Sequence, residues 1–252
     1  MISMNRKGPI RTLSVLTNFT DQHTHMAAAE TKLWYLEQMN ILQGMSMEEM
    51  QRVMERTRMS GAVKDQQIFF ADQPSNAIYF LKKGRVKIAT TSEEGKEIVK
   101  AVLFPGEVFG ELAIAGEEMR HDRAVALDDD VVICSMDLAD AQLMLGRDPR
   151  LHMAFTRLIG QRMIGLERRL ENLVFKDSRS RIIALLRNMA TAHGRKVGHE
   201  VQLDHSLTHQ DIADLTATSR QTVTTVLSDL QKQDLVHMER GSILIRNLDH
   251  LK

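Results

Sequence analysis

The sequence predicts a mixed α+β fold: an antiparallel β-roll, then one long helix, then a small helical unit that ends in a β-hairpin. Three observations predict it. Short β-branched and aromatic runs alternate with turn signals between residues 66 and 136. Apolar residues recur at helical spacing between 149 and 175, and again in two shorter stretches between 208 and 230. Two strand-like runs then flank the dipeptide Arg240-Gly241.

Composition fits a folded protein with a sizeable core. The chain has 252 residues, of which 43% are hydrophobic and 26% charged, and its formal net charge is +0, so no overall basic field points to a nucleic-acid partner. The single cysteine, Cys134, excludes a disulfide framework and a four-cysteine metal cluster within one chain, and we expect it to be a small core residue. No apolar run reaches membrane-spanning length and no signal-peptide core is present, so we expect a cytoplasmic protein without a membrane partner.

The N-terminal third divides into an arm and a helical entry. Residues 1–30 mix Gly, Pro, Thr, Asn and His without a period, so we expect a flexible arm, whether the chain starts at Met1 or at a later methionine. The pair His23 and His25 lies in this arm with no obvious third ligand, so no metal site is predicted. From residue 31 the pattern becomes helical, and Ser46 with Glu49 forms a capping-box start.

The β-roll is predicted from six runs: QQIFFA, AIYFLKK, RVKIATTS, KEIVKAVLF, AVAL and VVICSM. Turn signals such as Pro74-Ser75-Asn76, Lys83-Gly84 and Pro105-Gly106 separate them. Closely spaced strands of this kind are typical of an antiparallel barrel or roll, which we place within residues 31–148.

The long helix at 149–175 carries a heptad pattern. Its apolar positions follow each other at spacings of four, three, four and three: Ile159, Met163, Leu166, Leu170 and Leu173. A stripe with this period favours a coiled-coil seam, and hence a homodimer. The alternative is that the stripe packs on the helix's own domain.

Two short helices joined by a tight turn are predicted in the remainder, 176–252. Thr208 with Asp211 resembles a capping box, and three residues after the first helix Ser219 can cap a second one, whose apolar positions are Val223, Val226, Leu227 and Leu230. This arrangement is a helix-turn-helix, and the strands around Arg240-Gly241 would form the wing of a winged helix.

The polar face of the second helix suits DNA. The predicted DNA-binding residues are Ser219, Arg220, Gln221, Thr222, Thr224 and Thr225, with Thr208 and His209 at the start of the first helix. Arginine can donate two hydrogen bonds to guanine, glutamine pairs in the same way with adenine, and threonine offers a methyl or a hydroxyl group. The predicted partner is double-stranded DNA. The alternative is a solvated helix face in a helical bundle.

Three stretches in order carry a family resemblance: FPGEVFGELA, RRLENLVFKDSRSRI and LTHQDIADLTATSRQTVTTVLSDLQKQDLV. With them the chain resembles the cyclic AMP receptor/fumarate–nitrate regulator (Crp/Fnr) superfamily of bacterial transcription regulators. The resemblance implies a cyclic-nucleotide-binding-like sensor domain (31–148), a dimerisation helix (149–175) and a winged-helix DNA-binding domain (176–252). It also implies a palindromic operator, RNA polymerase as a partner, and no enzymatic activity or catalytic residue.

The resemblance also assigns reading positions. Arg220 matches the arginine that contacts guanine, whereas Gln221 and Thr225 stand where cyclic AMP receptors have Glu and a second Arg, so the operator should not simply copy theirs. Ala217 replaces the glycine usual in the turn, at a cost of roughly 1 kcal/mol if its φ is positive.

The same resemblance implies an effector pocket, for which the candidate residues are Gly110, Glu111, Arg120, His121 and Arg162. Family pockets combine a Gly-Glu with a later Arg-Ser/Thr that holds the cyclic phosphate. If Arg120 matches the phosphate-binding arginine, His121 and Asp122 follow it, and the Asp122 carboxylate would repel a phosphate. An alignment one residue later instead puts His121 and Asp122 at the Arg-Ser positions and leaves no phosphate clamp. Leu166 and Glu167 stand at the adenine-contacting positions.

We therefore expect a regulator that cyclic AMP does not gate in the usual way, and no cofactor is predicted. Glu111 can instead pair with Arg120 or Arg123 for structural reasons. Three alternatives stay open: control by another ligand or by none, gating by a cyclic nucleotide after all, and a small-molecule sensor whose helix-turn-helix serves protein contacts.

Overall fold

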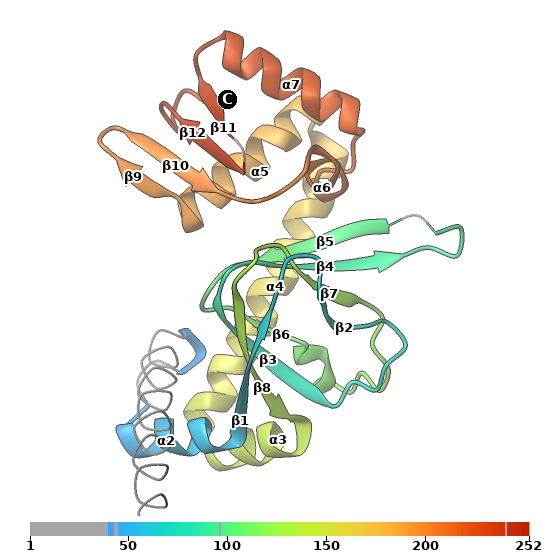
Figure 1. The fold of residues 1–252 in the computed structure, drawn as a ribbon, viewed down its shortest axis with the longest axis vertical. Helices are drawn as coiled ribbons and strands as arrows, with labels where there is room; N and C mark the ends of the chain where they lie inside the picture. The colour runs from blue at the N-terminus through green and yellow to red at the C-terminus, as the bar shows by residue number, and fades with distance from the viewer. Residues whose placement is uncertain (1–39, 43–44, 96, 240, 252) are drawn as a thin grey trace, which may run out of the picture.

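The computed structural model describes residues 40–42, 45–95, 97–239 and 241–251. A β-rich domain and a smaller C-terminal domain are joined by the long helix α4 (Pro149–Phe175), which runs along the β-rich domain toward the C-terminal one (Figure 1). The predicted mixed α+β class is confirmed. The predicted arm at 1–30, with His23 and His25, lies outside the described residues.

The β-rich domain is a roll of two antiparallel four-stranded sheets. One sheet has the order β1 (Thr57–Ala62), β8 (Val131–Asp137), β3 (Ala77–Lys83) and β6 (Val108–Phe109). The other has the order β2 (Gln67–Phe69), β7 (Arg123–Ala126), β4 (Val86–Thr91) and β5 (Glu97–Leu103). The six predicted runs lie in β2, β3, β4, β5, β7 and β8, whereas β1 and β6 were not expected. The sequence of β1, TRMSGA, has no apolar alternation, and the strand forms at the sheet edge by pairing with β8.

Two apolar clusters hold the roll together. The cluster between the sheets includes Leu81, Val86, Phe109, Ala126 and Ile133. On the outer face of the first sheet, a second cluster packs strand residues against the short helices α2 (Met47–Arg56) and α3 (Leu138–Arg147). Cys134 belongs to this second cluster and is fully buried, as predicted for a small core residue.

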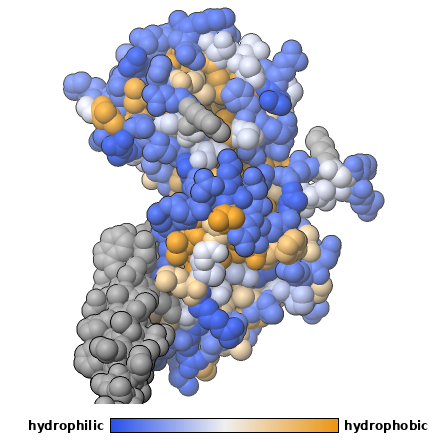
Figure 2. Space-filling view, viewed as in Figure 1, coloured by the Kyte–Doolittle hydropathy of each residue, from blue (hydrophilic) through white to orange (hydrophobic). Residues whose placement is uncertain are grey.

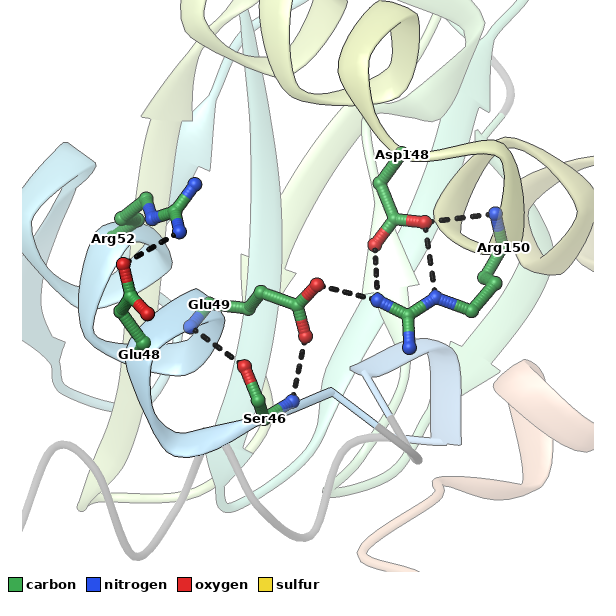
Figure 3. Close-up of polar contacts among 6 residues, drawn as sticks. All are labelled: Ser46, Glu48, Glu49, Arg52, Asp148 and Arg150. Carbon is green, nitrogen blue, oxygen red and sulfur yellow. Dashed lines mark hydrogen bonds and ion pairs between the residues drawn. The ribbon is translucent and has the colours of Figure 1, made fainter.

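The capping box predicted at the start of α2 is present. The Glu49 backbone N–H donates to Ser46 Oγ over 3.3 Å, and the Ser46 N–H donates to the Glu49 carboxylate over 2.6 Å. The same carboxylate contacts Arg150 of α4, which also pairs with Asp148, the N-cap of α4 (Figure 3). The polar cluster therefore ties the entry of the roll to the first turn of the long helix.

The long helix is buried at its start and exposed toward its end. Leu151 and Phe155 are buried, but most of the large apolar side chains farther along the helix are exposed. The seam residues Met163, Leu166, Leu170 and Leu173 are 59%, 63%, 64% and 47% exposed. Within the described part of this protomer four of the five seam residues are largely exposed and Ile159 is half-buried, which favours an intermolecular seam over packing on the helix's own domain.

The C-terminal domain packs three helices on a four-stranded sheet of order β11-β12-β10-β9. Its elements are α5 (Ser178–His193), β9 (Arg195–Val197), β10 (Glu200–Asp204), α6 (His209–Leu215), α7 (Arg220–Lys232), β11 (Val236–Glu239) and β12 (Ser242–Ile245). The predicted hairpin is β11–β12, which pairs Val236 with Ile245, and the C-terminus lies beside it (Figure 1). Strands β9 and β10, of three and five residues, were not expected.

The surface is mostly hydrophilic, with local apolar patches. Figure 2 shows hydrophilic residues over most of one face, with apolar residues reaching the surface in the C-terminal domain and along the roll. No helix among the described residues is long and apolar enough to cross a membrane. No group of three or more His, Cys, Asp or Glu in the described ranges could hold a metal ion.

Candidate DNA-reading site and effector pocket

The first helix of the helix-turn-helix is fixed by its cap. The Asp211 backbone N–H donates to Thr208 Oγ1 over 3.1 Å, and the Thr208 N–H donates to Asp211 Oδ2 over 2.8 Å. Ile212 and Ala213 are buried against the domain core. The predicted capping box therefore sets the start of α6, and its two reciprocal bonds satisfy backbone donors that a helix start leaves free.

The turn between the helices contains a strained residue. Ala217 has φ 49°, in the left-handed region where glycine is preferred, so this departure from the family pattern carries the strain anticipated from the sequence. Thr216 is buried and donates its hydroxyl to Ile212 O over 2.7 Å. The Thr218 N–H donates to Ala213 O over 2.9 Å, which closes the turn.

The second helix, α7, exposes a polar face. Its N-cap Ser219 accepts from the Thr222 N–H over 3.0 Å, so Ser219 and Thr222 hold the helix start. Ser219, Arg220, Gln221, Thr224 and Thr225 are exposed, while the apolar positions predicted for this helix are buried. The side chains of Arg220 and Gln221 form no hydrogen bond with the described residues, and both can turn outward to a ligand.

A contact between the helices was missed from the sequence. His209 Nδ1 lies 2.9 Å from Thr224 Oγ1, which also donates to Arg220 O over 3.0 Å. The contact fixes the exposed face of α7 relative to the first turn of α6. Residues fifteen apart in different helices carry no local signal of such a contact.

The pocket residues surround a cavity of about 350 Å³ between the roll and α4. Its lining includes Gly110, Glu111, Arg120 and Arg162. His121 is exposed and is not among the residues that line the cavity, so this predicted pocket residue lies apart from the others. Gly110 has φ 73°, and a Cβ there would lie 2.9 Å from Arg120 Nη1, so both the turn and the space require glycine.

Arg120 is bound within the roll. It is 3% exposed, donates to Gly110 O over 3.1 Å and to Ala77 O, and its charge lies 3.5 Å from Glu117 Oε2. Its guanidinium also lies over the ring of Phe69, 4.6 Å from the centroid. Burial lowers the pKa of Arg120, which the neighbouring Tyr79, Glu117 and Glu111 partly offset.

The Glu111 pairing expected from the sequence was wrong. Glu111 forms its ion pair with Arg162 of α4, whose guanidinium also donates to Val108 O. Arg120 pairs with Glu117 instead, and Arg123 pairs with Glu97. The sequence did not indicate Arg162 as the partner of Glu111, because the two residues meet only through the packing of α4 on the roll.

Asp122 also lines the cavity. It pairs with Lys100 of β5 over 2.5 Å, so a carboxylate stands in the cavity wall. Leu166 lines the same cavity from α4.

The two domains contact each other through residues that sequence reasoning missed. Arg85 of the roll forms a two-pronged ion pair with Asp128, at 2.8 and 2.7 Å, and also donates to Ser206 Oγ over 2.6 Å. Lys87 of β4 lies 3.5 Å from Asp211, the capping residue of α6. The helix-turn-helix is therefore held against the roll from its first helix.

Two family models match this chain, one in each domain. Residues 62–148 match the cyclic nucleotide-binding domain, and residues 180–252 match the Crp-like helix-turn-helix domain. In fold, the chain is similar to FixK2 from Bradyrhizobium japonicum, with a TM-score of 0.69, 20% identity and coverage of 77% of this chain and 95% of that one.

Two curated relatives show how far the sequence similarity extends. A CRP-like cAMP-activated global transcriptional regulator of Mycobacterium tuberculosis is 27% identical over 73% of this chain and 82% of its own length. The global nitrogen regulator of Nostoc sp. is 30% identical over 184 residues, which are 72% of this chain and 82% of that protein. With the domain matches and the shared fold, this similarity establishes that the chain belongs to the Crp/Fnr family of DNA-binding transcription regulators, whose members are not enzymes.

Proposed function

We propose that the chain acts in the cytoplasm as a homodimer that binds a palindromic operator in double-stranded DNA, without gating by cyclic AMP through a phosphate clamp. The proposed division is an arm at 1–30, a sensor domain at 31–148, a dimerisation helix at 149–175 and a DNA-binding domain at 176–252. RNA polymerase is the proposed partner at the promoter.

Support for the homodimer comes from α4. Four seam residues at heptad spacing are each about half or more exposed in one protomer. Burying a leucine side chain stabilises an assembly by roughly 1.5–3 kcal/mol, so a second α4 packed along this seam removes a large unfavourable exposure. Two parallel helices with apolar residues at these spacings form a coiled coil.

Support for DNA reading comes from the exposed face of α7, which is the observation that carries the proposal. Arg220 and Gln221 lie at the start of the helix, where recognition helices contact base edges, and neither is engaged within the described chain. Arg220 suits guanine and Gln221 suits adenine, and Ser219, Thr208 and His209 are placed to approach phosphates. A dimer presents two such helices to half-sites roughly 34 Å apart.

The effector proposal depends on Arg120 and Asp122. The guanidinium of Arg120 already donates to two backbone carbonyls and is paired with Glu117, so it is not free to neutralise a phosphate. Asp122 adds a negative charge to the cavity wall. These residues do not fit the cyclic phosphate clamp, which supports regulation by another ligand or by expression alone.

Gating by cyclic AMP is the second candidate. Gly110-Glu111 favours it, because the glycine conformation and the glutamate of the family pattern are both retained at the cavity. The name of the Mycobacterium tuberculosis relative, which describes cAMP activation of that protein, favours it as well.

One selection experiment tests both candidates. The purified protein is stripped of bound nucleotide, and binders are selected from a random duplex pool with and without cyclic AMP. We expect the same palindrome in both arms. A palindrome only with cyclic AMP would overturn the effector proposal, and no palindrome in either arm would count against operator binding by the protein as purified.

A salt titration tests DNA binding itself. The affinity for the selected duplex should fall steeply as the salt concentration rises, because phosphate contacts release counterions. A salt-independent interaction would instead favour a helix-turn-helix that serves protein contacts.

A further inference from the structure

The junction between α4 and the DNA-binding domain is short and capped on both sides. Helix α4 ends at Phe175, Lys176 is its C-cap, and Asp177 is already the N-cap of α5. The Asp177 carboxylate accepts from the Ser180 N–H over 2.7 Å, and hydrogen bonds from the Ser180 hydroxyl and from this N–H lower the pKa of Asp177. Since only two residues separate two capped helices, the direction of α5 relative to α4 is sensitive to any further contact at this point.

Arg181, in the first turn of α5, makes that further contact. Its Nη1 donates to Lys176 O over 2.7 Å, and its Nη2 lies 3.3 Å from Ser178 Oγ. On its other side, Nε donates to Thr216 O over 2.8 Å and Nη2 donates to Ala217 O over 3.1 Å. One guanidinium therefore bridges the end of α4, the start of α5 and the turn between α6 and α7.

Two of the three carbonyls share one chemical character. Lys176 is the C-cap of α4 and Thr216 is the C-cap of α6, so both carbonyls belong to helix ends, where backbone acceptors lack intrahelical partners and carry partial negative charge. A guanidinium offers five donors in a rigid planar fork and stays charged. A lysine ammonium at this position keeps the charge but cannot hold both sides in the same fixed geometry.

The contact also lies next to the residues that direct α7. Ala217 is the strained residue of the turn, and Ser219, two positions later, is the N-cap of α7. Fixing the carbonyls of Thr216 and Ala217 to the end of α4 therefore fixes where the recognition helix starts relative to the dimerisation helix.

We infer that Arg181 is a positioning residue that sets the separation of the two recognition helices in the dimer, and thereby the half-site spacing of the operator. The inference rests on the proposed function, because spacing has meaning only for a dimer on a two-part site. Arg181 itself does not touch DNA in this mechanism.

The experiment compares Arg181→Lys with Arg187→Lys in the full chain. Arg187 lies on the same helix and also donates to a backbone carbonyl, Leu251 O, over 2.9 Å, but it contacts neither α4 nor the turn. Each protein is used to select from duplexes that carry the wild-type half-sites separated by a series of spacers. Affinity for the palindrome and for a single half-site is measured in parallel.

We expect the wild type and Arg187→Lys to enrich one spacing. Arg181→Lys should enrich several spacings and bind the original palindrome on the order of tenfold more weakly, the effect expected for loss of charge-assisted hydrogen bonds. Its affinity for a single half-site should change much less. A merely stabilising role would lower the unfolding temperature and leave the spacing preference intact, and that result would overturn the inference.

A second measurement needs no DNA. Spin labels at Gln231, an exposed position near the end of α7, report the distance between the two recognition helices of the dimer. The distribution should broaden in Arg181→Lys and stay narrow in Arg187→Lys. If the lysine variant does not fold, Arg181→Gln, which retains a planar donor group, replaces it in both measurements, and an unchanged distribution there would count against the inference. Failure of the wild type to select any palindrome would instead count against the proposed function.

Discussion

Arg162 of α4 pairs with Glu111 of the roll, and the pair joins the long helix directly to the wall of the cavity. The Glu111 side chain is 8% exposed and that of Arg162 is 30% exposed, so the glutamate depends on its partner for compensation of its charge. The contact spans the space between roll and helix that an effector would occupy. This ion pair therefore connects α4 to the roll without a bound ligand.

Replacing Arg162 with Ala should therefore destabilise the roll. The loss leaves a buried carboxylate without its partner, which costs about 1–3 kcal/mol after allowance for the partial exposure of the arginine. Urea unfolding monitored by circular dichroism measures the change. The double variant Glu111→Gln with Arg162→Met should recover most of the loss, because it removes both charges together. Equal losses in the single and double variants would contradict the pairing as the cause.

Arg220→Ala should weaken operator binding by about 1–3 kcal/mol and relax the preference at one guanine in each half-site. The arginine lies at the exposed start of α7, where a two-pronged contact to guanine is available. Selection from the random duplex pool and titration of the selected site measure the two effects. Gln231→Ala, near the other end of the same helix, is the matched control and should leave both unchanged. A wild-type base preference in Arg220→Ala would remove Arg220 from the reading set.

Local patterns in the sequence were enough for much of this architecture. The capping boxes at Ser46 and Thr208 depend on residues three apart, and both are present. The hairpin β11–β12 and the apolar face of α7 were also predicted from local patterns. Side chains on one face recur every two residues in a strand and about every 3.6 residues in a helix, and a single segment displays either period.

Contacts between distant segments could not be predicted in the same way. Glu111 was expected to pair with Arg120 or Arg123 nearby, but α4 brings Arg162 to it from fifty-one positions away in the sequence. The contacts of Arg181 could not be predicted, because its main acceptors are backbone carbonyls. Every residue has such a carbonyl, so the sequence does not show which one accepts a hydrogen bond. Strand β1 was missed for a similar reason, because the β8 residues with which it pairs lie 69 to 79 positions later in the sequence.

Leu170→Asp should convert the dimer to a monomer. Leu170 is 64% exposed on the described protomer and lies near the end of the seam, so a carboxylate there would face its own copy across the helix pair. Sedimentation equilibrium gives the association state, and duplex binding should fall with it. Met153→Asp is a suitable control, because Met153 is 50% exposed on the same helix but lies outside the heptad positions. A dimeric Leu170→Asp protein would place the interface elsewhere.

His205 should make the stability of the protein fall in mild acid. It is buried beside the domain joint, accepts from the Leu207 N–H through Nδ1 over 2.8 Å, and its Nε2 has no hydrogen-bond partner among the described residues. Burial, with the nearby charge of Arg85, lowers the pKa of His205 from 6.5 to about 4. Between these values the unfolded chain binds more protons than the folded one, so the free energy of unfolding falls as the pH falls.

The expected loss attributable to His205 is about 2 kcal/mol between pH 7 and pH 5. Urea unfolding at the two pH values measures it, and the variant His205→Asn isolates it, since an asparagine can accept the same backbone N–H without titrating. The pH-dependent difference should shrink by about that amount in His205→Asn and stay at the wild-type value in His199→Asn, a change at an exposed histidine in the same domain. If both variants keep the wild-type difference, the acid sensitivity comes from carboxylates elsewhere in the chain, and the burial of His205 does not control it.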